Sequence, residues 1–136
     1  MTQAVSVLVV EDEELIQEIV NEALEDGGFD VVRAMTGEEA VAKLEAADAD
    51  YRALVTDIRL GRSALLGWDV AKRAREIHPE MPVVYISGDS GHDWSANGVP
   101  GSLMITKPFA PAQLVTAVAQ LINERAAAPS GNDPET

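Results

Sequence analysis

The chain has 136 residues, of which 46% are hydrophobic and 4% aromatic, and it contains no cysteine. This length is typical of one domain, here with an aliphatic core, and the lack of cysteine excludes disulfides, thiolate metal sites and cysteine nucleophiles. A net charge of -13 argues against binding to nucleic acid or to an anionic membrane. No lysine or arginine precedes Arg33 and no apolar run reaches the ~20 residues of a membrane span, so we expect a cytoplasmic protein.

The first part of the chain alternates short aliphatic runs with helical patterns. Val5–Val10 is almost entirely valine and leucine, which is typical of a strand covered on both faces. A helical pattern follows and ends at Gly27-Gly28; its predicted inward stripe is Leu15, Ile16, Ile19, Val20, Ala23 and Leu24. Phe29–Ala34 predicts a second strand, and Thr36 with Glu39 forms a capping-box pattern that opens a second helix.

The middle of the chain repeats this alternation. Ala53–Asp57 predicts a third strand, and the helix after it is expected to bury Leu66, Val70, Ala71, Ala74 and Ile77. That helix has to end before Pro79, because proline cannot continue it. Pro82–Ser87 then predicts a fourth strand.

The last part of the chain begins with a weak crossover. Residues 88–101 are rich in glycine and have almost no apolar stripe, so we expect only a short helix there. Ser102–Thr106 predicts a fifth strand, and Pro111 lies in the first turn of a last helix. We expect residues 1–125 to form one domain and the polar, proline-rich residues 126–136 to form a disordered tail.

The alternation of strands and helices predicts an α/β fold. Such chains form a doubly wound parallel sheet with right-handed crossovers and helices on both faces. Five strands fit the order 2-1-3-4-5, in which ligands bind beyond the carboxyl ends of the strands, between strands one and three. The search for a site therefore starts at the carboxyl ends.

Complementary polar residues stand at four of these ends. Glu11 and Asp12 follow the first strand, Asp57 ends the third, Ser87 ends the fourth and Lys107 follows the fifth. Crowded carboxylates repel one another unless a hard cation such as Mg²⁺ binds them. The set suits phosphoryl transfer, with Asp57 as nucleophile, Asp12 and Asp57 on the metal, Glu11 helping through water, and Lys107 and Ser87 on phosphoryl oxygens. Taken singly, the acids after the first strand also suit the start of a helix.

At these residues the sequence resembles the receiver domain of bacterial two-component response regulators. The resemblance covers Val5 to about Glu124 and rests on four pieces in order, Val7–Glu13, Leu54–Leu60, Val83–Gly88 and Thr106–Phe109. It implies that Asp57 accepts a phosphoryl group from a histidine kinase or phosphotransfer protein. It also implies that Asp12, Asp57 and the backbone carbonyl of Arg59 bind Mg²⁺, that the Ser87 hydroxyl moves toward the phosphoryl group, and that Lys107 binds it.

Two features concern the strand that precedes Lys107. Met104 stands three residues before this lysine, where the family carries a switch aromatic, so the usual output coupling is in doubt. Tyr85 on the fourth strand is an alternative aromatic, although packing in the core is its simpler role. The Lys107–Pro108 peptide bond is often cis in the family.

Two loops also depart from the family pattern. Leu60–Ala64 replaces the usual Met-Pro after the acceptor strand, and we expect an Arg59–Asp89 ion pair that partly covers the site. Residues 88–101 weaken the helix through which many members signal. Trp94 in that segment either anchors an interface or folds back onto the core.

The sequence therefore predicts a stand-alone receiver that signals through contacts with a downstream protein and is not an enzyme. Two alternatives stay open. One is a phosphorylation-independent pseudo-receiver. The other is a haloacid-dehalogenase-like phosphatase, although Asp57-Ile58-Arg59 lacks the second aspartate of its Asp-x-Asp pattern.

Overall fold

A computed structural model describes residues 5–61, 63–88 and 94–127. It contains strands and helices in the order that the sequence predicts. The strands are β1 (Val5–Val10), β2 (Phe29–Ala34), β3 (Ala53–Asp57), β4 (Val83–Ser87) and β5 (Leu103–Thr106). The helices are α1 (Glu14–Asp26), α2 (Gly37–Glu45), α3 (Gly67–Ile77), α4 (Trp94–Asn97) and α5 (Pro111–Ala127).

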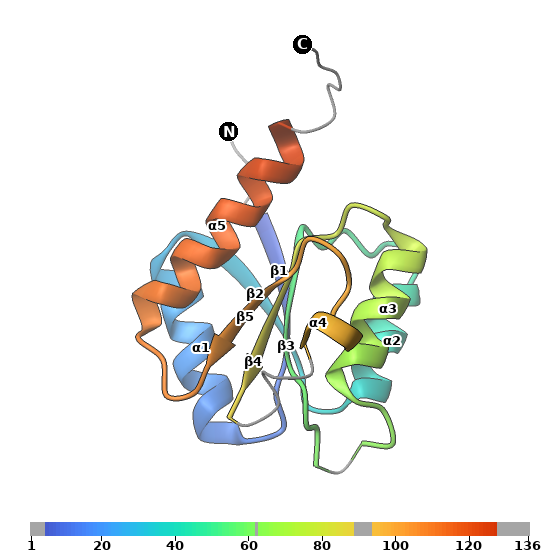
Figure 1. Cartoon of the computed structure of the whole chain (residues 1–136), viewed down its shortest axis with the longest axis horizontal. Helices are drawn as coiled ribbons and strands as arrows, with labels where there is room; N and C mark the ends of the chain where they lie inside the picture. The colour runs from blue at the N-terminus through green and yellow to red at the C-terminus, as the bar shows by residue number, and fades with distance from the viewer. Residues whose placement is uncertain (1–4, 62, 89–93, 128–136) are drawn as a thin grey trace.

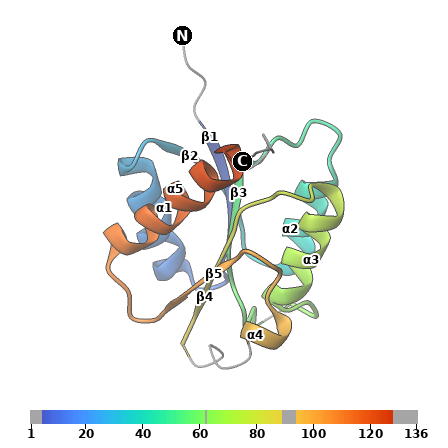
Figure 2. The same cartoon turned by 45° about the horizontal axis from the view of Figure 1, so that its top comes forward.

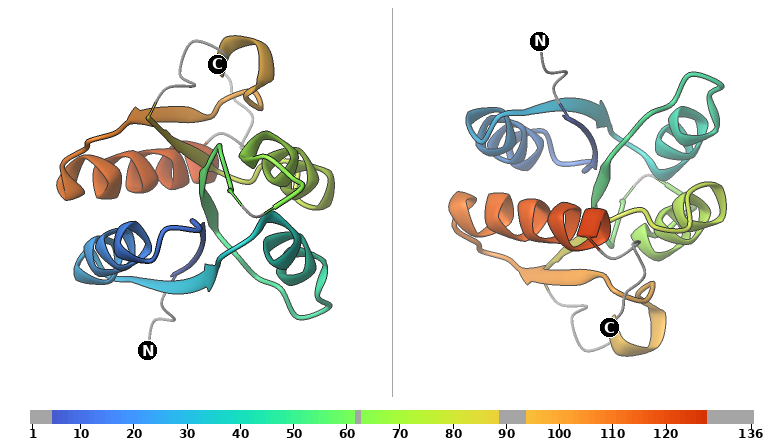
Figure 3. Two further views of the ribbon diagram at one scale, coloured as in Figure 1. Left: turned by 90° about the horizontal axis from the view of Figure 1, so that it is seen from below. Right: turned by 90° about the horizontal axis from the view of Figure 1, so that it is seen from above.

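The strands form one parallel sheet in the order β2-β1-β3-β4-β5, the flavodoxin-like, doubly wound order that the sequence predicts. In register, Val10 of β1 lies beside Thr56 of β3, and Asp57 of β3 lies beside Ile86 of β4. Helices α1 and α5 cover one face of the sheet, and α2 and α3 cover the other (Figures 1 and 3). Because all strands run in one direction, their carboxyl ends lie at the same edge.

Each face of the sheet carries its own aliphatic core. Along β1, Val7 and Val9 face the core under α1 and α5, whereas Leu8 and Val10 face the core under α2 and α3. This alternation explains why the strand is apolar throughout, since successive side chains point to opposite faces.

Helix α1 differs from its predicted orientation. Leu15 and Ile19, both expected to face inward, are 76% and 49% exposed, while Gln17 is fully buried. The Gln17 amide donates hydrogen bonds to the carbonyls of Glu11 (3.1 Å) and Ala34 (3.2 Å), which turns this side chain toward the sheet. Positions 15 and 17 are separated by about 200° around a helix, so burying Gln17 exposes Leu15.

Helix α2 begins with the predicted cap, in a slightly different form. Thr36 Oγ1 accepts a hydrogen bond from the Glu39 N–H at 3.0 Å. The Glu39 carboxylate accepts from the N–H of Met35 at 2.8 Å, one residue earlier than in a standard capping box.

The short helix α4 confirms the weak fourth crossover. It is four residues long and lies on the α3 side of the sheet (Figure 2). Trp94 packs against the core under α2 and α3, and its indole N–H donates to Ser102 Oγ at 2.9 Å. Trp94 thus folds back onto the core, which was one of its two predicted roles. Residues 89–93 of the crossover lie outside the described residues.

Helix α5 continues through Ala127, two residues past the predicted domain boundary at 125. Residues 128–136 lie outside the described residues, so the disordered tail stays a prediction. No helix in the described ranges is long and apolar enough to cross a membrane.

Candidate functional site

The residues singled out from the sequence converge at the carboxyl edge of the sheet. Asp57 and Ser87 are the last residues of neighbouring strands, and both are buried. Beside them, the Lys107 N–H donates to the Ser87 carbonyl at 2.8 Å, which extends the pairing of β4 and β5 by one residue. Asp57, Ser87 and Lys107 therefore lie side by side at the carboxyl edge of the sheet, as the strand order predicts.

Three carboxylates form an acidic cluster at this edge. Glu11, Asp12 and Asp57 each offer a carboxylate oxygen within 4.8 Å of the others. Glu11 and Asp57 are buried, at 1% and 6% exposure, whereas Asp12 is half-buried. The cluster can hold a metal ion, because oxygen ligands at this spacing suit a hard divalent cation.

Lys107 reaches into the acidic cluster. Its ammonium lies 2.7 Å from Asp57 Oδ2, 3.6 Å from Glu11 Oε1 and 3.8 Å from Glu13 Oε1. Burial alone would lower the pKa of Lys107, but the hydrogen bond to Asp57 and the surrounding negative charges raise it above its usual value. The lysine is therefore held in its cationic form beside the Asp57 carboxylate.

The pKa of Glu11 is strongly shifted by its place in the acidic cluster. Burial raises the pKa of Glu11 to about 8, and the Asp57 charge adds to that effect, while the Glu13 N–H and Lys107 oppose it. One oxygen, Oε2, accepts from the Glu13 N–H at 3.0 Å, whereas Oε1 has no hydrogen-bond partner among the described residues. A bound cation would supply the interaction that this buried carboxylate oxygen lacks. The three carboxylates therefore fit a divalent metal.

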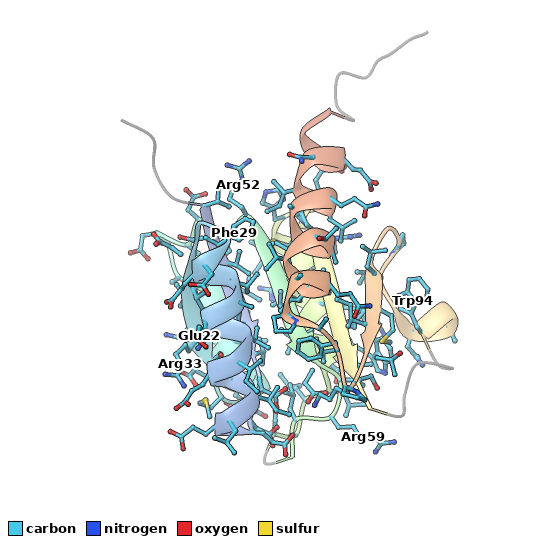
Figure 4. All side chains as sticks on the ribbon, turned by 90° about the vertical axis from the view of Figure 1, so that its left-hand side faces the viewer. Glu22, Phe29, Arg33, Arg52, Arg59 and Trp94 are labelled. Carbon is cyan, nitrogen blue, oxygen red and sulfur yellow. The ribbon has the colours of Figure 1, made fainter. Side chains whose placement is uncertain are left out.

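Arg59 lies in the loop after β3, and its side chain projects from the carboxyl edge into solvent (Figure 4). Its backbone carbonyl stays a predicted metal ligand. The predicted ion pair with Asp89 lies outside the described residues. The Lys107–Pro108 peptide bond is cis, as the resemblance implies.

Met104 and Tyr85, the two residues considered for the switch aromatic, both pack against the core. Met104 lies beside Tyr85 in register and packs against the core under α2 and α3. Tyr85 is fully buried, and its ring makes an edge-to-face contact with the ring of Trp68, with 4.7 Å between the ring centroids. The Tyr85 hydroxyl accepts a hydrogen bond from the Val99 N–H at 3.1 Å. Tyr85 therefore packs in the core, which was its simpler predicted role.

Two residues near the site were not singled out from the sequence. Glu13 approaches Lys107, and Gln17 bonds the Glu11 carbonyl. A polar Gln17 inside an apolar helical pattern was a usable signal, because a buried amide needs hydrogen-bond partners. Glu13 gave no signal, since it is one of several consecutive acids.

The chain has well-defined relatives. Residues 7–119 match the response regulator receiver domain family. The solved structure of a response regulator receiver protein from Sinorhizobium medicae WSM419 is 44% identical, with a TM-score of 0.87, and the match covers 90% of this chain and 98% of that one.

Two curated proteins are also similar. The alkaline phosphatase synthesis transcriptional regulatory protein PhoP of Bacillus subtilis is 32% identical over 91% of this chain. The autoinducer 1 sensor kinase/phosphatase LuxN of Vibrio campbellii is 32% identical over 65% of it. This chain spans about half of the first relative (51%) and 10% of the second. The family match extends over most of the chain, including every strand end that contributes to the acidic cluster, and the chain belongs to the response regulator receiver domains.

Proposed function

We propose that this receiver domain accepts a phosphoryl group on Asp57, with Mg²⁺ bound in the acidic cluster, and passes the signal on through protein contacts. One observation carries the proposal. A buried carboxylate, Asp57, lies 2.7 Å from the Lys107 ammonium and shares an edge with Glu11 and Asp12. An acceptor oxygen, a cation for phosphoryl oxygens and a metal-binding set are thus within reach of one another.

The proposed step is a displacement at phosphorus. An oxygen of Asp57 attacks the phosphoryl group of a phosphohistidine, an O–P bond forms and the P–N bond breaks. The electron pair leaves with the imidazole, which takes up a proton. Lys107 would neutralise charge on the phosphoryl oxygens, and the hydroxyl of Ser87, at the end of the next strand, would donate to one of them.

The metal would be held by residues of this chain alone. Glu11, Asp12 and Asp57 would bind Mg²⁺ directly or through water, joined by the backbone carbonyl of Arg59. When bound, the ion supplies positive charge at the phosphoryl oxygens. Glu11 Oε1 supports this assignment, because it is buried and accepts no hydrogen bond from the described residues, with the Lys107 ammonium 3.6 Å away.

The phosphoryl donor would be a histidine kinase or a phosphotransfer protein. Helix α1 begins two residues after Asp12, and it carries the exposed apolar side chains of Leu15 (76%) and Ile19 (49%). We propose that these two residues form part of the surface on which the donor rests while its histidine reaches Asp57. The downstream target stays unidentified, and the cytoplasmic location stays a prediction.

The alternatives predict different chemistry. A phosphatase of the haloacid-dehalogenase type would turn over a phosphomonoester. A pseudo-receiver would bind its partner without any phosphoryl group. The close contact of Lys107 with Asp57, inside a complete acidic set, favours a phosphoacceptor over a pseudo-receiver. Asp57-Ile58-Arg59, which lacks a second aspartate, argues against the phosphatase.

The test is chemical phosphorylation followed by intact-mass measurement. We expect acetyl phosphate with Mg²⁺ to add one phosphoryl group, and we expect Asp57→Asn or a chelator to prevent it. Asp30→Asn, on the exposed side of β2, is the matched control and keeps full labelling. Labelling of Asp57→Asn at the wild-type level would refute the assignment. A wild-type chain that resists both acetyl phosphate and phosphoramidate would favour the pseudo-receiver.

A further inference from the structure

The loop between β3 and α3 is tied to the start of α2 by one serine. Ser63 Oγ donates a hydrogen bond to Glu38 Oε1 at 2.6 Å and accepts from the N–H groups of Gly37 and Leu65, both at 3.1 Å. The other Glu38 oxygen accepts from the Ala64 N–H at 3.0 Å. A hydroxyl has one proton to donate and two lone pairs, so every hydrogen-bonding position of Ser63 is used. We call Glu38, Ser63 and Ala64 the latch.

The latch brings the loop very close to α2. A Cβ at Gly37 would lie 2.8 Å from Ser63 Oγ and 2.8 Å from the Leu65 Cβ, closer than real Cβ atoms approach. The Ser63 hydroxyl also lowers the pKa of Glu38, which keeps the carboxylate ionised as an acceptor. The contact is therefore specific to these residues and is not a general packing of loop on helix.

The opposite side of the same loop touches the acidic cluster. A Cβ at Gly61 would lie 2.7 Å from Asp12 Oδ2, so the Asp12 carboxylate rests directly against the Gly61 backbone. Leu60, the residue before Gly61, is buried (2% exposed), and its carbonyl accepts a hydrogen bond from the Ser63 N–H at 2.7 Å. This hydrogen bond links Ser63 to the segment that places Gly61 against Asp12.

Asp12 is the least buried member of the acidic cluster. Glu11 and Asp57 are buried, whereas Asp12 is half-buried. We infer that the latch is a positioning device for the metal site. It holds Gly61 against Asp12 and so keeps the Asp12 carboxylate beside Glu11 and Asp57. This inference rests on the proposed function, since it assumes that the acidic cluster binds Mg²⁺.

A second link between α2 and α3 provides the control. At the other end of these helices, Arg73 of α3 pairs with Glu45 of α2 at 2.8 Å. This link joins the same two helices but touches no residue of the acidic cluster. If the latch acted only by general packing of α2 on α3, loss of either link would have the same effect.

The experiment measures Mg²⁺ affinity of the unphosphorylated chain by calorimetry, with circular dichroism to verify folding. We expect Ser63→Ala to weaken Mg²⁺ binding about tenfold, as is typical when an outer-shell partner is lost. Ser63→Thr keeps the hydroxyl and restores affinity, and Arg73→Ala binds Mg²⁺ like the wild type. Glu38→Gln gives a smaller loss than Ser63→Ala, because its amide oxygen still accepts from Ser63 and only the bond from the Ala64 N–H is lost.

Two further readouts separate positioning from a merely structural role. At saturating Mg²⁺, Ser63→Ala should reach the wild-type rate of acetyl phosphate labelling, because only metal binding is weakened. Gly61→Ala displaces Asp12 directly, so adding Ser63→Ala to it should cost little more.

The outcomes are distinct for the inference and for the proposed function. Wild-type Mg²⁺ affinity in folded Ser63→Ala, or an equal loss in Arg73→Ala, overturns the inference and leaves the proposed function intact. If Ser63→Ala does not fold, the Mg²⁺ affinity of Glu38→Gln takes its place, and wild-type affinity of that variant overturns the inference. A wild-type chain that binds no Mg²⁺ overturns both.

Discussion

Two clusters of charged side chains near opposite edges of the sheet differ in exposure rather than in distance. In the outer cluster, Arg73 lies 2.8 Å from Glu45 and 3.0 Å from Glu76, and these side chains are 41%, 45% and 65% exposed. In the inner cluster, which we define as Lys107, Asp57 and Glu11, the shortest contact is 2.7 Å and the Asp57 side chain is 8% exposed.

Exposure decides what each cluster can do. Water screens the outer cluster, so its ion pairs contribute little to stability. The inner cluster has lost much of its hydration, which is costly unless each charge is matched. The single lysine cannot match both acids once Glu11 is ionised. The inner cluster is therefore poised to bind a cation, and the predictions below test this contrast.

Removal of Lys107 should have the largest effect on stability. Lys107→Met leaves the buried Asp57 carboxylate without its cation, so we expect the free energy of unfolding at pH 7.5 without divalent metal to fall by about 3–5 kcal/mol. Urea denaturation measures the change, and Mg²⁺ should restore part of it, because a ligand that binds only the folded state stabilises it. Unchanged stability would mean that the lysine is not what balances these acids.

Removal of the Glu11 charge should act in the opposite direction. Burial raises the pKa of Glu11 to about 8, so the folded state keeps a proton that the unfolded state releases near pH 4.5. Without metal, this group therefore lowers stability as the pH rises from about 4.5 to about 8, and no further above that. Glu11→Gln abolishes this dependence, and we expect it to be roughly 2–4 kcal/mol more stable than the wild type at pH 8.5.

The measurement is urea denaturation of both chains in a chelator across this pH range. The pH-dependent difference between the two chains should vanish below about pH 4.5, where Glu11 of the wild type is protonated in the folded and in the unfolded state alike. A difference that is constant with pH would show that it arises from packing and not from charge.

Much of the inner cluster could be predicted from the sequence. Glu11, Asp12, Asp57 and Lys107 follow or end apolar strands, and a parallel sheet brings such ends to one edge. The strand order and the short α4 were predicted for similar reasons, because aliphatic runs and glycine content are local properties.

Other features depend on contacts between distant residues. The rotation of α1 that exposes Leu15 and Ile19 follows from the bond of Gln17 to the Ala34 carbonyl, which no helical pattern contains. Likewise, Glu38 and Ser63 lie 25 residues apart and meet only because the loop between β3 and α3 folds against the start of α2. The raised pKa of Glu11 needs its burial, which is a property of the folded chain.

Substitution of Gln17 tests a buried hydrogen bond between uncharged groups. Gln17→Met fills the same space but removes the donor to the Glu11 carbonyl, while the Ala34 carbonyl keeps the Glu11 N–H as a donor at 3.1 Å. Gln17 Oε1 has no partner among the described residues, so its removal offsets part of the loss. We expect a net cost of about 1 kcal/mol in urea denaturation. Leu15→Ala, on the exposed side of the same helix, is the control and should change stability little.

The outer cluster should give the smallest effect. Arg73→Ala removes these two ion pairs, but all three side chains remain in contact with water in the folded state. We therefore expect the melting temperature to change by less than about 2 °C. Differential scanning calorimetry at low and at high salt measures it, and the small difference should shrink further as salt screens the charges. A large, salt-independent loss would place Arg73 with Lys107 among the charges that the fold depends on, and exposure would then no longer separate the two clusters.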